Sequence, residues 1–481
     1  MTTRVQLAIV GAGPAGMAAA LEAKRLGLAC ALIDEQPRPG GQIYRRGAAR
    51  DPSLEAALGA EYAHGMALIE RVLAAGIDYR PGTVLWDLSS TRRLSLVAAS
   101  GSSELDADQV ILATGAMERP VPIPGWTLPG VMGAGAAQIM LKTAGAVPQK
   151  PVVLAGSGPL LFLLAAQLLE SGAEIRALVE TTPFANRLAA AAHLPAALWQ
   201  RALLSKGLDL LARLKRAKVR RFTGAADLSI EGARACEAIR FRAGGAAQRI
   251  ESELVLLHEG VIPNVHASLA IGCAHDWDGV QLCWHPRLGP WGETSVEGVA
   301  IAGDGGGING AEAAEYLGRL AALGAAHRLG VLDEAQRDDA ARAPRAALAR
   351  LAGARRFVDA LYRPARGQRV PKDDATLVCR CEEVPAGEIR RAARLGAIGL
   401  TQAKAYTRCG MGPCQGRLCA PTVQALVAET RGMEEEAVPP YRPRPPYKPV
   451  TLGMIAAFRD PSFRVESAAE HLYRQDVKDE V

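Results

Sequence analysis

Residues 5–16 read VQLAIVGAGPAG, an apolar run that leads directly into the glycine pattern of Gly11–Gly16. An Ala-rich stretch, Met17–Leu26, follows, and a second apolar run, Cys30–Ile33, ends at Asp34. A strand, a glycine turn, a helix and a second strand that ends in an acid are typical of the βαβ unit of a parallel sheet. The sequence therefore predicts an α/β fold whose first turn binds a dinucleotide.

Each part of this pattern has a physical role in holding a pyrophosphate. Gly11 allows the tight turn, Gly13 lets the backbone approach the phosphates, and Gly16 lets the helix lie close to the strand. Free amides at the start of the helix then face the phosphates. Asp34 stands 23 positions after Gly11, where a carboxylate accepts a hydrogen bond from a ribose hydroxyl.

Two later motifs favour FAD over NAD. Residues 111–115 (ILATG) are similar to the ATG motif of flavoproteins with two dinucleotide-binding domains, and residues 298–304 (GVAIAGD) are similar to their third flavin motif, whose Asp binds the ribityl chain. Residues 309–311 open the next helix, which either points amides at the flavin ring or is a plain helix start. The predicted FAD-binding residues are Gly11, Gly13, Pro14, Ala15, Gly16, Asp34, Glu35, Gly41, Gln42, Thr114, Gly115, Gly303, Asp304, Asn309, Gly310 and Ala311.

A second copy of the pattern covers residues 152–180, but its glycines are incomplete. Gly156 and Gly158 remain, whereas Leu161 stands at the third position, where its side chain disturbs a phosphate cradle. Two interpretations stay open: a fold kept for its architecture, or a fold that holds an adenine nucleotide weakly through Glu180. Neither the flavin motifs nor the second fold contains a cysteine pair, so thiol–disulfide exchange is not expected.

Composition and charge indicate several globular domains. The 481 residues exceed one compact core, 49% of them are hydrophobic, and the net charge is +6. Basic and acidic residues are mixed along the chain, so binding to nucleic acid is not expected. Residues 1–30 lack the pattern of a secretory signal, and no apolar run is long enough for a membrane span. We therefore expect a cytoplasmic protein, with peripheral binding at the inner membrane left open.

Nine cysteines in such a chain indicate metal or redox chemistry rather than a disulfide framework. Cys379 and Cys381 form a C-x-C pair, and after 27 further residues Cys409 is followed by Cys414 and Cys419. Thiolates at this density bind zinc or an iron–sulfur cluster, and spacing alone leaves both open, with a site without metal as a third option. A C-x-C gap is unusual in zinc ribbons, and a flavoprotein favours [2Fe-2S] because zinc carries no electrons.

The cysteine segment resembles the BFD-like [2Fe-2S] domain of bacterioferritin-associated ferredoxins. In that domain a C-x-C pair is followed by C-x-x-C, whereas here four residues separate Cys409 from Cys414. The resemblance implies the ligand set Cys379, Cys381, Cys409 and Cys414. Cys419, about one helical turn beyond Cys414, remains an alternative to either member of the second pair.

Nearly the whole chain resembles one family, through the cysteine domain and the motifs at Gly11–Gly16, Pro37–Arg45 (PRPGGQIYR), Gly156–Leu161 and Gly303-Asp304. It is similar to the α-type subunit of multi-subunit flavin-dependent dehydrogenases. These include opine oxidase A subunits, hydrogen cyanide synthase B subunits, and the α subunits of D-hydroxyproline or imino-acid dehydrogenases. The α subunit of heterotetrameric sarcosine oxidase is a more distant relative.

The resemblance implies an electron-transfer subunit. In the family, a separate β subunit of the D-amino-acid-oxidase type oxidises the C–N bond of an amino acid, imino acid or opine with its own FAD, and the α subunit passes the electrons onward. A small ferredoxin-like γ subunit stays open, as does an FMN at an interface between subunits. No catalytic residue is assigned, because His258, His266, His275 and His285 form no convincing acid–base pair near the flavin motifs.

Two other functions fit the same sequence. The first is a NAD(P)H-dependent flavin and iron–sulfur reductase that acts alone, although Leu161 argues against nicotinamide binding. The second is a scaffold whose flavin and metal are structural.

The expected architecture is an α/β flavoprotein with two dinucleotide-binding domains, like glutathione and thioredoxin reductases, plus a small helical BFD-like iron–sulfur domain. We place the FAD-binding domain at residues 1–125 and 255–330, a degenerate NAD(P)-binding-like domain at 126–254, a helical linker at 331–371, the iron–sulfur domain at 372–432 and a proline-rich extended tail at 433–481. Residues 439–449 (PPYRPRPPYKP) exclude helix and central strand. They suit a strap across a partner or across the chain's own FAD domain.

Overall fold

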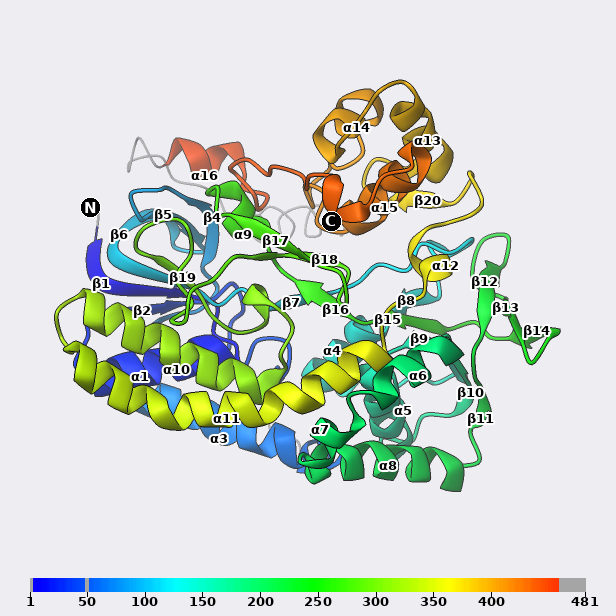
Figure 1. The fold of residues 1–481 in the computed structure, drawn as a ribbon, viewed down its shortest axis with the longest axis horizontal. Helices are drawn as coiled ribbons and strands as arrows, with labels where there is room; N and C mark the ends of the chain where they lie inside the picture. The colour runs from blue at the N-terminus through cyan, green and yellow to red at the C-terminus, as the bar shows by residue number, and fades with distance from the viewer. Residues whose placement is uncertain (1–2, 48–51, 458–481) are drawn as a thin grey trace, which may run out of the picture.

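The computed structural model describes residues 3–47 and 52–457 of the chain. Two α/β units lie next to each other, and a small helical module and the C-terminal tail cover one side of them (Figure 1). The long helix α11 (Glu334–Leu361) contacts helices of both units. The relative placement of these parts determines where any bound groups would meet.

The first unit is built around a seven-stranded sheet with the order β3-β2-β1-β6-β5-β4 and with β19 paired to β6. Its strands are β1 (Thr3–Val10), β2 (Cys30–Ile33), β3 (Asp78–Arg80), β4 (Val84–Leu88), β5 (Arg93–Ala98), β6 (Gly101–Leu112) and β19 (Val299–Ile301). Its helices are α1 (Pro14–Arg25), α2 (Pro52–Leu58), α3 (Ala60–Ala74), the 3-10 turn η1 (Gly303–Gly306) and α10 (Ala311–Arg328). β2 is buried along its whole length, as its unbroken apolar sequence predicts.

The strands predicted at residues 5–10 and 30–33 are confirmed as β1 and β2, and β19 lies within the GVAIAGD motif at residues 298–304. The ILATG motif at residues 111–115 begins at the buried end of β6, which is twelve residues long and pairs antiparallel with β5. The first half of β6 reads GSSELDAD and carries no continuous apolar pattern, so periodicity detects only its second half.

The second unit contains a parallel five-stranded sheet with the order β11-β10-β9-β15-β8 and an antiparallel three-stranded sheet, β12-β13-β14. Its strands are β8 (Val131–Gly133), β9 (Val152–Ser157), β10 (Ile175–Glu180), β11 (Arg220–Phe222), β12 (Ala226–Glu231), β13 (Ala238–Ala243), β14 (Ala246–Glu251) and β15 (Val255–Glu259). Its helices are α4 (Ala134–Ala144), α5 (Pro159–Glu170), α6 (Phe184–Ala191), α7 (Leu194–Leu198) and α8 (Arg201–Arg216). The predicted second strand–turn–helix–strand unit is confirmed as β9, α5 and β10.

Two short ribbons lie outside the main sheets. They are β7 (Ala116–Glu118) with β16 (Val261–Pro263), and the hairpin of β17 (His275–Asp278) with β18 (Cys283–Pro286). The five-residue helix α9 (His266–Ala270) lies between them in the chain. These segments face the cysteine module.

Helix α11 forms most of the helical linker that the sequence predicts at residues 331–371. Asp333 caps the helix by accepting from the amide of Gln336, and the Gln336 side chain accepts from the Asp333 amide in return. The helix tolerates Pro344 in its interior and ends at Leu361, before Pro364. The short helix α12 (Arg366–Arg369) then leads to the cysteine module.

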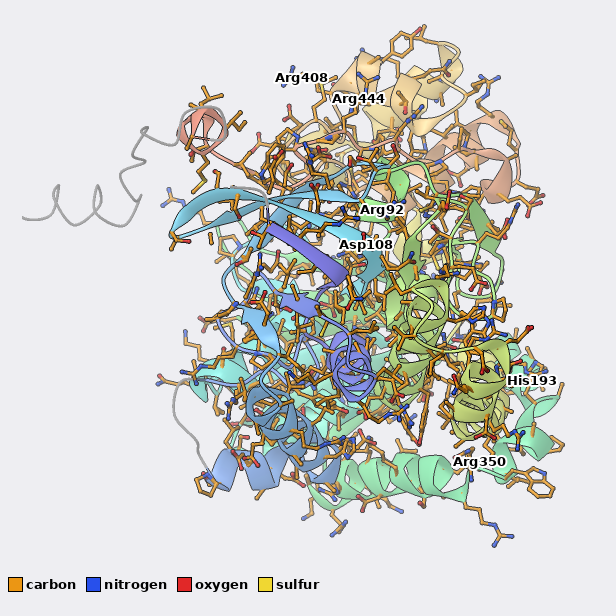
Figure 2. All side chains as sticks on the ribbon, turned by 90° about the vertical axis from the view of Figure 1, so that its left-hand side faces the viewer. Arg92, Asp108, His193, Arg350, Arg408 and Arg444 are labelled. Atoms are coloured by element: carbon orange, nitrogen blue, oxygen red, sulfur yellow. The ribbon has the colours of Figure 1, made fainter. Side chains whose placement is uncertain are left out.

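The cysteine module is small and mainly helical, with a core of its own. It consists of β20 (Leu377–Cys379), β21 (Val384–Pro385), α13 (Ala386–Arg394), α14 (Leu400–Thr407), α15 (Ala420–Arg431) and the 3-10 turn η2 (Glu435–Ala437). Figure 2 shows charged side chains such as Arg408 of this module and Arg350 of α11 on the outside of the molecule.

The tail has no helix or strand over residues 439–449, as its proline content predicts, and then forms α16 (Leu452–Ala456). Residues 458–481 of the predicted tail lie outside the described residues. Across residues 3–47 and 52–457, no helix is long and apolar enough to span a bilayer.

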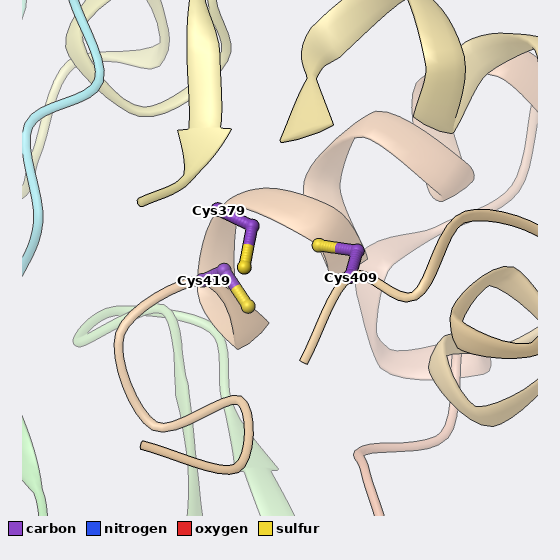
Figure 3. Close-up of side chains that lie close together, drawn as sticks. All are labelled: Cys379, Cys409 and Cys419. Carbon is purple, nitrogen blue, oxygen red and sulfur yellow. The ribbon is translucent and has the colours of Figure 1, made fainter. Parts of the chain in front are cut away.

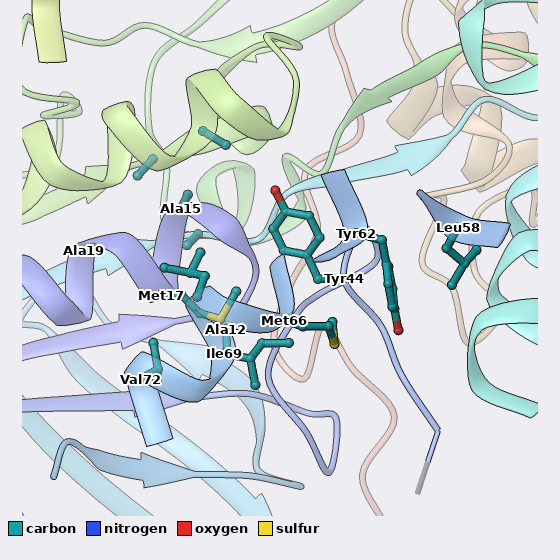
Figure 4. Packing of buried hydrophobic residues seen from close by; sticks show 14 of the residues in the cluster. Ala12, Ala15, Met17, Ala19, Tyr44, Leu58, Tyr62, Met66, Ile69 and Val72 are labelled. Carbon is teal, nitrogen blue, oxygen red and sulfur yellow. The ribbon is translucent and has the colours of Figure 1, made fainter. Parts of the chain in front are cut away.

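The core of the first unit packs directly behind the glycine turn. Figure 4 shows Met17 of α1, Met66 and Ile69 of α3 and the ring of Tyr44 in this cluster. A Cβ atom at Gly65 would lie 2.1 Å from the Tyr44 ring, so glycine is needed for this approach. This packing fixes residues 40–44 next to the turn.

Candidate functional site

The three predicted flavin motifs meet at one edge of the first sheet. The parallel strands β1, β6 and β19 are in register there, with Val10 opposite Leu112 and Leu112 opposite Ile301. The glycine turn, the Thr114-Gly115 segment and Gly303 each follow one of these strands directly. Segments almost 300 residues apart in the chain thus form one site.

Packing alone requires glycine at two of the three positions of the first glycine turn. A Cβ atom would lie 2.3 Å from the Ala113 carbonyl oxygen at Gly11, and 1.8 Å from the Gly11 carbonyl oxygen at Gly16. At Gly13 the nearest atom is 3.8 Å away, on Gly41. The space in front of Gly13, at the N-terminus of α1, therefore fits the approach of a phosphate group.

The two acids after β2 have different surroundings. Asp34 is buried and accepts hydrogen bonds from the amides of Ala12 (2.5 Å) and Gln36 (2.7 Å). Burial raises the pKa of Asp34, against the effect of these two amides. The Glu35 side chain is 42% exposed and pairs with Lys448 of the tail at 2.6 Å. Asp34 thus holds the turn, and Glu35 is the more accessible acid for a ribose.

The third motif completes the site around Asp304. Its Oδ1 accepts from the amides of Asn309 (2.8 Å) and Gly310 (2.9 Å), which precede α10. A Cβ atom at Gly303 would lie 2.7 Å from the Cβ of Ala15, so this motif touches the start of α1. The structure therefore brings the predicted FAD residues of all three motifs together.

A buried lysine beside this site was not found from the sequence. Lys142 of α4 donates to the carbonyl oxygen of Ile43 (2.8 Å), next to the predicted Gly41-Gln42 segment, and to Gln138 (3.0 Å). Burial is the main cause that lowers the pKa of Lys142 to about 7. Lys142 is an isolated cation in an apolar helix, which gives no sequence motif.

The second glycine turn has a different environment. A Cβ atom at Gly158 would lie 3.2 Å from the imidazole of His258, which pairs with Glu118 at 2.6 Å. Leu161 is fully buried in the core. An imidazole ring therefore lies in front of Gly158, where Gly13 of the first turn has open space.

The acid of the second fold, Glu180, also forms ion pairs within the chain. Glu180 is buried and its carboxylate pairs with Arg221 at 2.6 Å and with Arg187 at 3.8 Å. The ring of Tyr362, just after α11, lies 6.3 Å from that of Phe162, and burial raises the pKa of Tyr362 to about 12. Residues of the chain itself thus surround the acid that would meet a nucleotide ribose.

Three of the five clustered cysteines meet in the module. The sulfur atoms of Cys379, Cys409 and Cys419 lie within 4.8 Å of one another and all three residues are buried (Figure 3). Hydrogen bonds from the other two thiols lower the pKa of Cys379 to about 2. Sulfur atoms at this separation fit a soft metal or an iron–sulfur cluster.

The other two cysteines, Cys381 and Cys414, are hydrogen-bonded to each other. A Cβ atom at Gly412 would lie 2.3 Å from the Cβ of Cys381, so this glycine lets the two loops meet. The five thiols therefore form a pair and a group of three. Of the predicted ligands, Cys381 and Cys414 are in the pair, and Cys379 and Cys409 share the group of three with Cys419.

The tail contributes a residue that sequence analysis missed. Tyr441 is buried, and its hydroxyl donates to the carbonyl oxygen of Cys409 at 2.8 Å. Its ring fits against Gly410 and Gly416, where a Cβ atom would lie 2.8 Å and 2.5 Å away. Only the fold shows that this part of the tail lies under the cysteine loops.

Comparisons with known proteins agree with this arrangement. Residues 5–318 match the pyridine nucleotide-disulphide oxidoreductase family, and residues 377–429 match the BFD-like [2Fe-2S] binding domain. Over 460 residues the chain is 43% identical to the opine oxidase A subunit of Agrobacterium tumefaciens (strain Ach5), with 94% of this chain and 91% of that protein covered. The chain belongs to the family of opine oxidase A subunits. It is also 35% identical over 462 residues to hydrogen cyanide synthase subunit HcnB of Pseudomonas protegens, covering 92% of this chain and 95% of that one.

Solved structures support the fold of this opine oxidase A family member. L-proline dehydrogenase from P. horikoshii superposes with a TM-score of 0.69 at 19% identity, covering 95% of this chain and 80% of that one. T. acidophilum thioredoxin reductase superposes with a TM-score of 0.51 at 18% identity, covering 68% of this chain and 99% of that one. The predicted fold class is confirmed. The family domains and the thiol cluster also confirm the prediction of FAD and a [2Fe-2S] cluster.

Proposed function

We propose that this chain is the electron-transfer subunit of a hetero-oligomeric dehydrogenase or oxidase. The observation that carries the proposal is the combination, in one chain, of a complete dinucleotide cradle, a cysteine module joined to it and an obstructed second fold. A flavoprotein that cannot readily take a nicotinamide receives its electrons from another donor. The named opine oxidase and hydrogen cyanide synthase relatives are themselves subunits, which supports a partner as that donor.

In this proposal the substrate is an amino acid, imino acid or opine whose C–N bond is oxidised in a β subunit of the D-amino-acid-oxidase type. The names of the relatives support this class, which includes opine and sarcosine oxidases. A small γ subunit remains compatible with it, as does an FMN at an interface between subunits. We place the assembly in the cytoplasm, where thiols stay reduced.

The chain's residues have separate tasks in this scheme. The turn around Gly13 and the N-terminus of α1 would hold the pyrophosphate, Glu35 would meet the ribose, and Asp304 would hold the ribityl chain of FAD. Bound FAD accepts electrons in pairs and a [2Fe-2S] cluster passes them on singly, which is the chemistry these groups supply. The protein fixes their positions and shields them from water.

The cluster ligands follow from the grouping of the thiols. We propose that Cys379, Cys381 and Cys414 would hold a [2Fe-2S] cluster together with a fourth thiol. The fourth ligand is Cys409, as the sequence suggests, or Cys419. Cys419 is the N-cap of α15, where the helix dipole favours a metal-bound thiolate, whereas Cys409 follows the C-terminal end of α14. Without metal, hydrogen bonds with Cys379 and Cys409, together with burial, raise the pKa of Cys419. The difference in position favours Cys419.

Anaerobic reduction of the purified chain tests the electron source. NADH and NADPH should reduce its flavin at least about a hundredfold more slowly than the complex with its β subunit does when given substrate. In Tyr362→Ala, which removes a ring beside Glu180 of the second fold, reduction of the flavin by NADH should become faster. The exposed Tyr406→Ala is the control and should leave this rate unchanged. Fast reduction of the wild-type chain by NADH would show instead a self-sufficient nicotinamide-dependent reductase.

A further inference from the structure

A cavity lies between the first α/β unit and the cysteine module. Its enclosed volume is about 70 Å³, and one side opens to solvent. Its walls come from the β7–β16 ribbon, α9, the β17–β18 hairpin, the start of α15 and the tail. Most of the lining is apolar, and the cross-strand pair Trp277 and Trp284, with ring centroids 5.6 Å apart, contributes aromatic surface.

One polar group in this wall has no partner. His266 is only 8% exposed, lines the cavity, and its Nε2 lacks a hydrogen-bond partner among the described residues. A buried polar atom without a partner costs free energy unless a ligand or water satisfies it. Burial lowers the pKa of His266 to about 3, and nearby Arg417 and Lys448 act in the same direction. The imidazole is therefore neutral and can donate one N–H.

The cavity also lies between the two predicted redox sites. On one side, the backbone amide of Asn264 donates to the Gly115 carbonyl oxygen (2.9 Å), and the backbone carbonyl oxygen of Asn264 accepts from the Thr114 hydroxyl (3.0 Å). On the other side, Gly416 and Arg417 belong to the loop between Cys414 and Cys419. A ligand in the cavity would therefore touch residues that adjoin both the flavin motif and the cysteine loops.

We propose that this cavity binds the ring of a quinone, which is the electron acceptor of the protein. A quinone offers a flat apolar ring for the tryptophan pair and two carbonyl oxygens, one for the Nε2–H of His266 and one for the guanidinium of Arg417. Its apolar side chain leaves through the open side. A flavin mononucleotide fits less well because its phosphate needs several donors, and Arg417 is the one cation among the described lining residues.

This inference rests on the proposed function, because the quinone must take electrons that the chain receives. Each quinone takes up two electrons and two protons and becomes a quinol. The electrons are those delivered by substrate oxidation, and the protons come from solvent at the open side of the cavity. Neutral His266 and Arg417 hold the two carbonyl oxygens and need not change charge.

Binding of decylubiquinone to the purified full-length chain tests the site without partner or substrate. Its dissociation constant, measured by tryptophan fluorescence quenching, should rise about tenfold in His266→Phe because one buried hydrogen bond is lost. His266→Gln, which can place an N–H at the same point, should restore binding to within about twofold. An azidoquinone should label peptides within residues 262–284 or 416–443.

The control is His285→Phe. His285 follows Trp284 on the same strand and is absent from the cavity wall, so its loss should leave binding unchanged. Unchanged affinity in His266→Phe, labelling elsewhere, or FMN that co-purifies in this cavity would each overturn the quinone assignment. None of these results would contradict electron delivery from a β subunit, which the NADH experiment tests separately.

Discussion

Glu259, at the end of β15, has a buried carboxyl group with one unpaired oxygen. It is 1% exposed, and its Oε1 accepts from the Thr181 hydroxyl at 2.6 Å. Its Oε2 has no hydrogen-bond partner among the described residues. Burial raises the pKa of Glu259 to about 8, against the opposing effects of Thr181 and the Arg119 guanidinium. At neutral pH the folded protein therefore holds a proton that the unfolded chain releases.

This proton makes stability depend on pH. The pKa is about 8 in the folded state and about 4.3 in the unfolded state, so the free energy of unfolding falls as pH rises between these values. Glu259→Gln should remove this fall and leave the variant more stable than wild type at pH 8.5, by on the order of a few kcal/mol. Urea unfolding at pH 5 and pH 8.5 measures the difference.

A carboxyl on the surface of the same unit provides the control. Glu174→Gln removes an exposed carboxyl and should change the free energy of unfolding by less than about 0.5 kcal/mol at both pH values. If Glu259→Gln lost stability equally at pH 5 and pH 8.5, the carboxyl would be ionised in the folded state and the raised pKa would be wrong.

At the scale of elements, the start of α15 determines which thiols can hold the cluster. Cys419→Ser should abolish the EPR signal of the reduced [2Fe-2S] cluster, because it removes the thiolate at the helix N-terminus. Cys409→Ser should keep the cluster with a small change in its g-values. EPR of both dithionite-reduced variants, with iron and sulfide analysis, makes the comparison.

The two cysteine variants form a matched pair, because both thiols are buried in the same group of three. Loss of the signal in Cys409→Ser alone would support the ligand set expected from sequence. Retention in both variants would mean that either thiol can serve as the fourth ligand.

Sequence periodicity predicted elements whose pattern is local. The units around Gly11 and Gly156 were found because an apolar strand, a glycine turn and a helix follow one another directly. The antiparallel sheet of β12–β14 was missed because its strands, such as AAQRIE at residues 246–251, are polar and largely exposed. Local patterns specify an element when burial makes its residues apolar.

The sites show the same limit. Motifs placed the residues around Gly13 and Asp304 correctly near one another, since their roles follow from backbone geometry. The contacts of Tyr362, Tyr441 and His266 depend on segments that are distant in the chain. Each is an ordinary aromatic residue in the sequence, and only tertiary packing gives it a role.

At the scale of the whole molecule, the tail joins the module to the first unit. Tyr441 lies under the cysteine loops, and six residues later Tyr447 is buried against the first sheet, with its amide donating to the Trp86 carbonyl oxygen at 3.1 Å. Lys448 pairs with Glu35, and the Ser102 hydroxyl donates to the Met454 carbonyl oxygen at 2.6 Å. Of the two alternatives for the strap, the described residues follow the chain's own first unit.

Other contacts also hold the module, so the tail is one of several attachments. The indole of Trp126 donates to the Leu377 carbonyl oxygen at 2.7 Å, and that of Trp284 donates to Gln424 at 3.1 Å. The ion pair of buried Arg369 with half-buried Glu435, at 2.7 Å, links α12 to the end of the module. The module should therefore stay folded and associated when the tail alone is released.

Tyr447→Ala tests the tail as a strap. Removal of a buried ring costs about 3 kcal/mol, which is close to a hundredfold in the equilibrium for local opening of the tail. Chymotrypsin should then cut the Tyr441–Arg442 bond more than about tenfold faster than in wild type, because brief opening of the tail exposes this bond, whose Tyr441 side chain is buried in the closed state. The exposed Tyr406→Ala should leave this rate unchanged. Equal cleavage rates in Tyr447→Ala and wild type would show that the tail is held elsewhere, and general cleavage across the chain would show global unfolding instead.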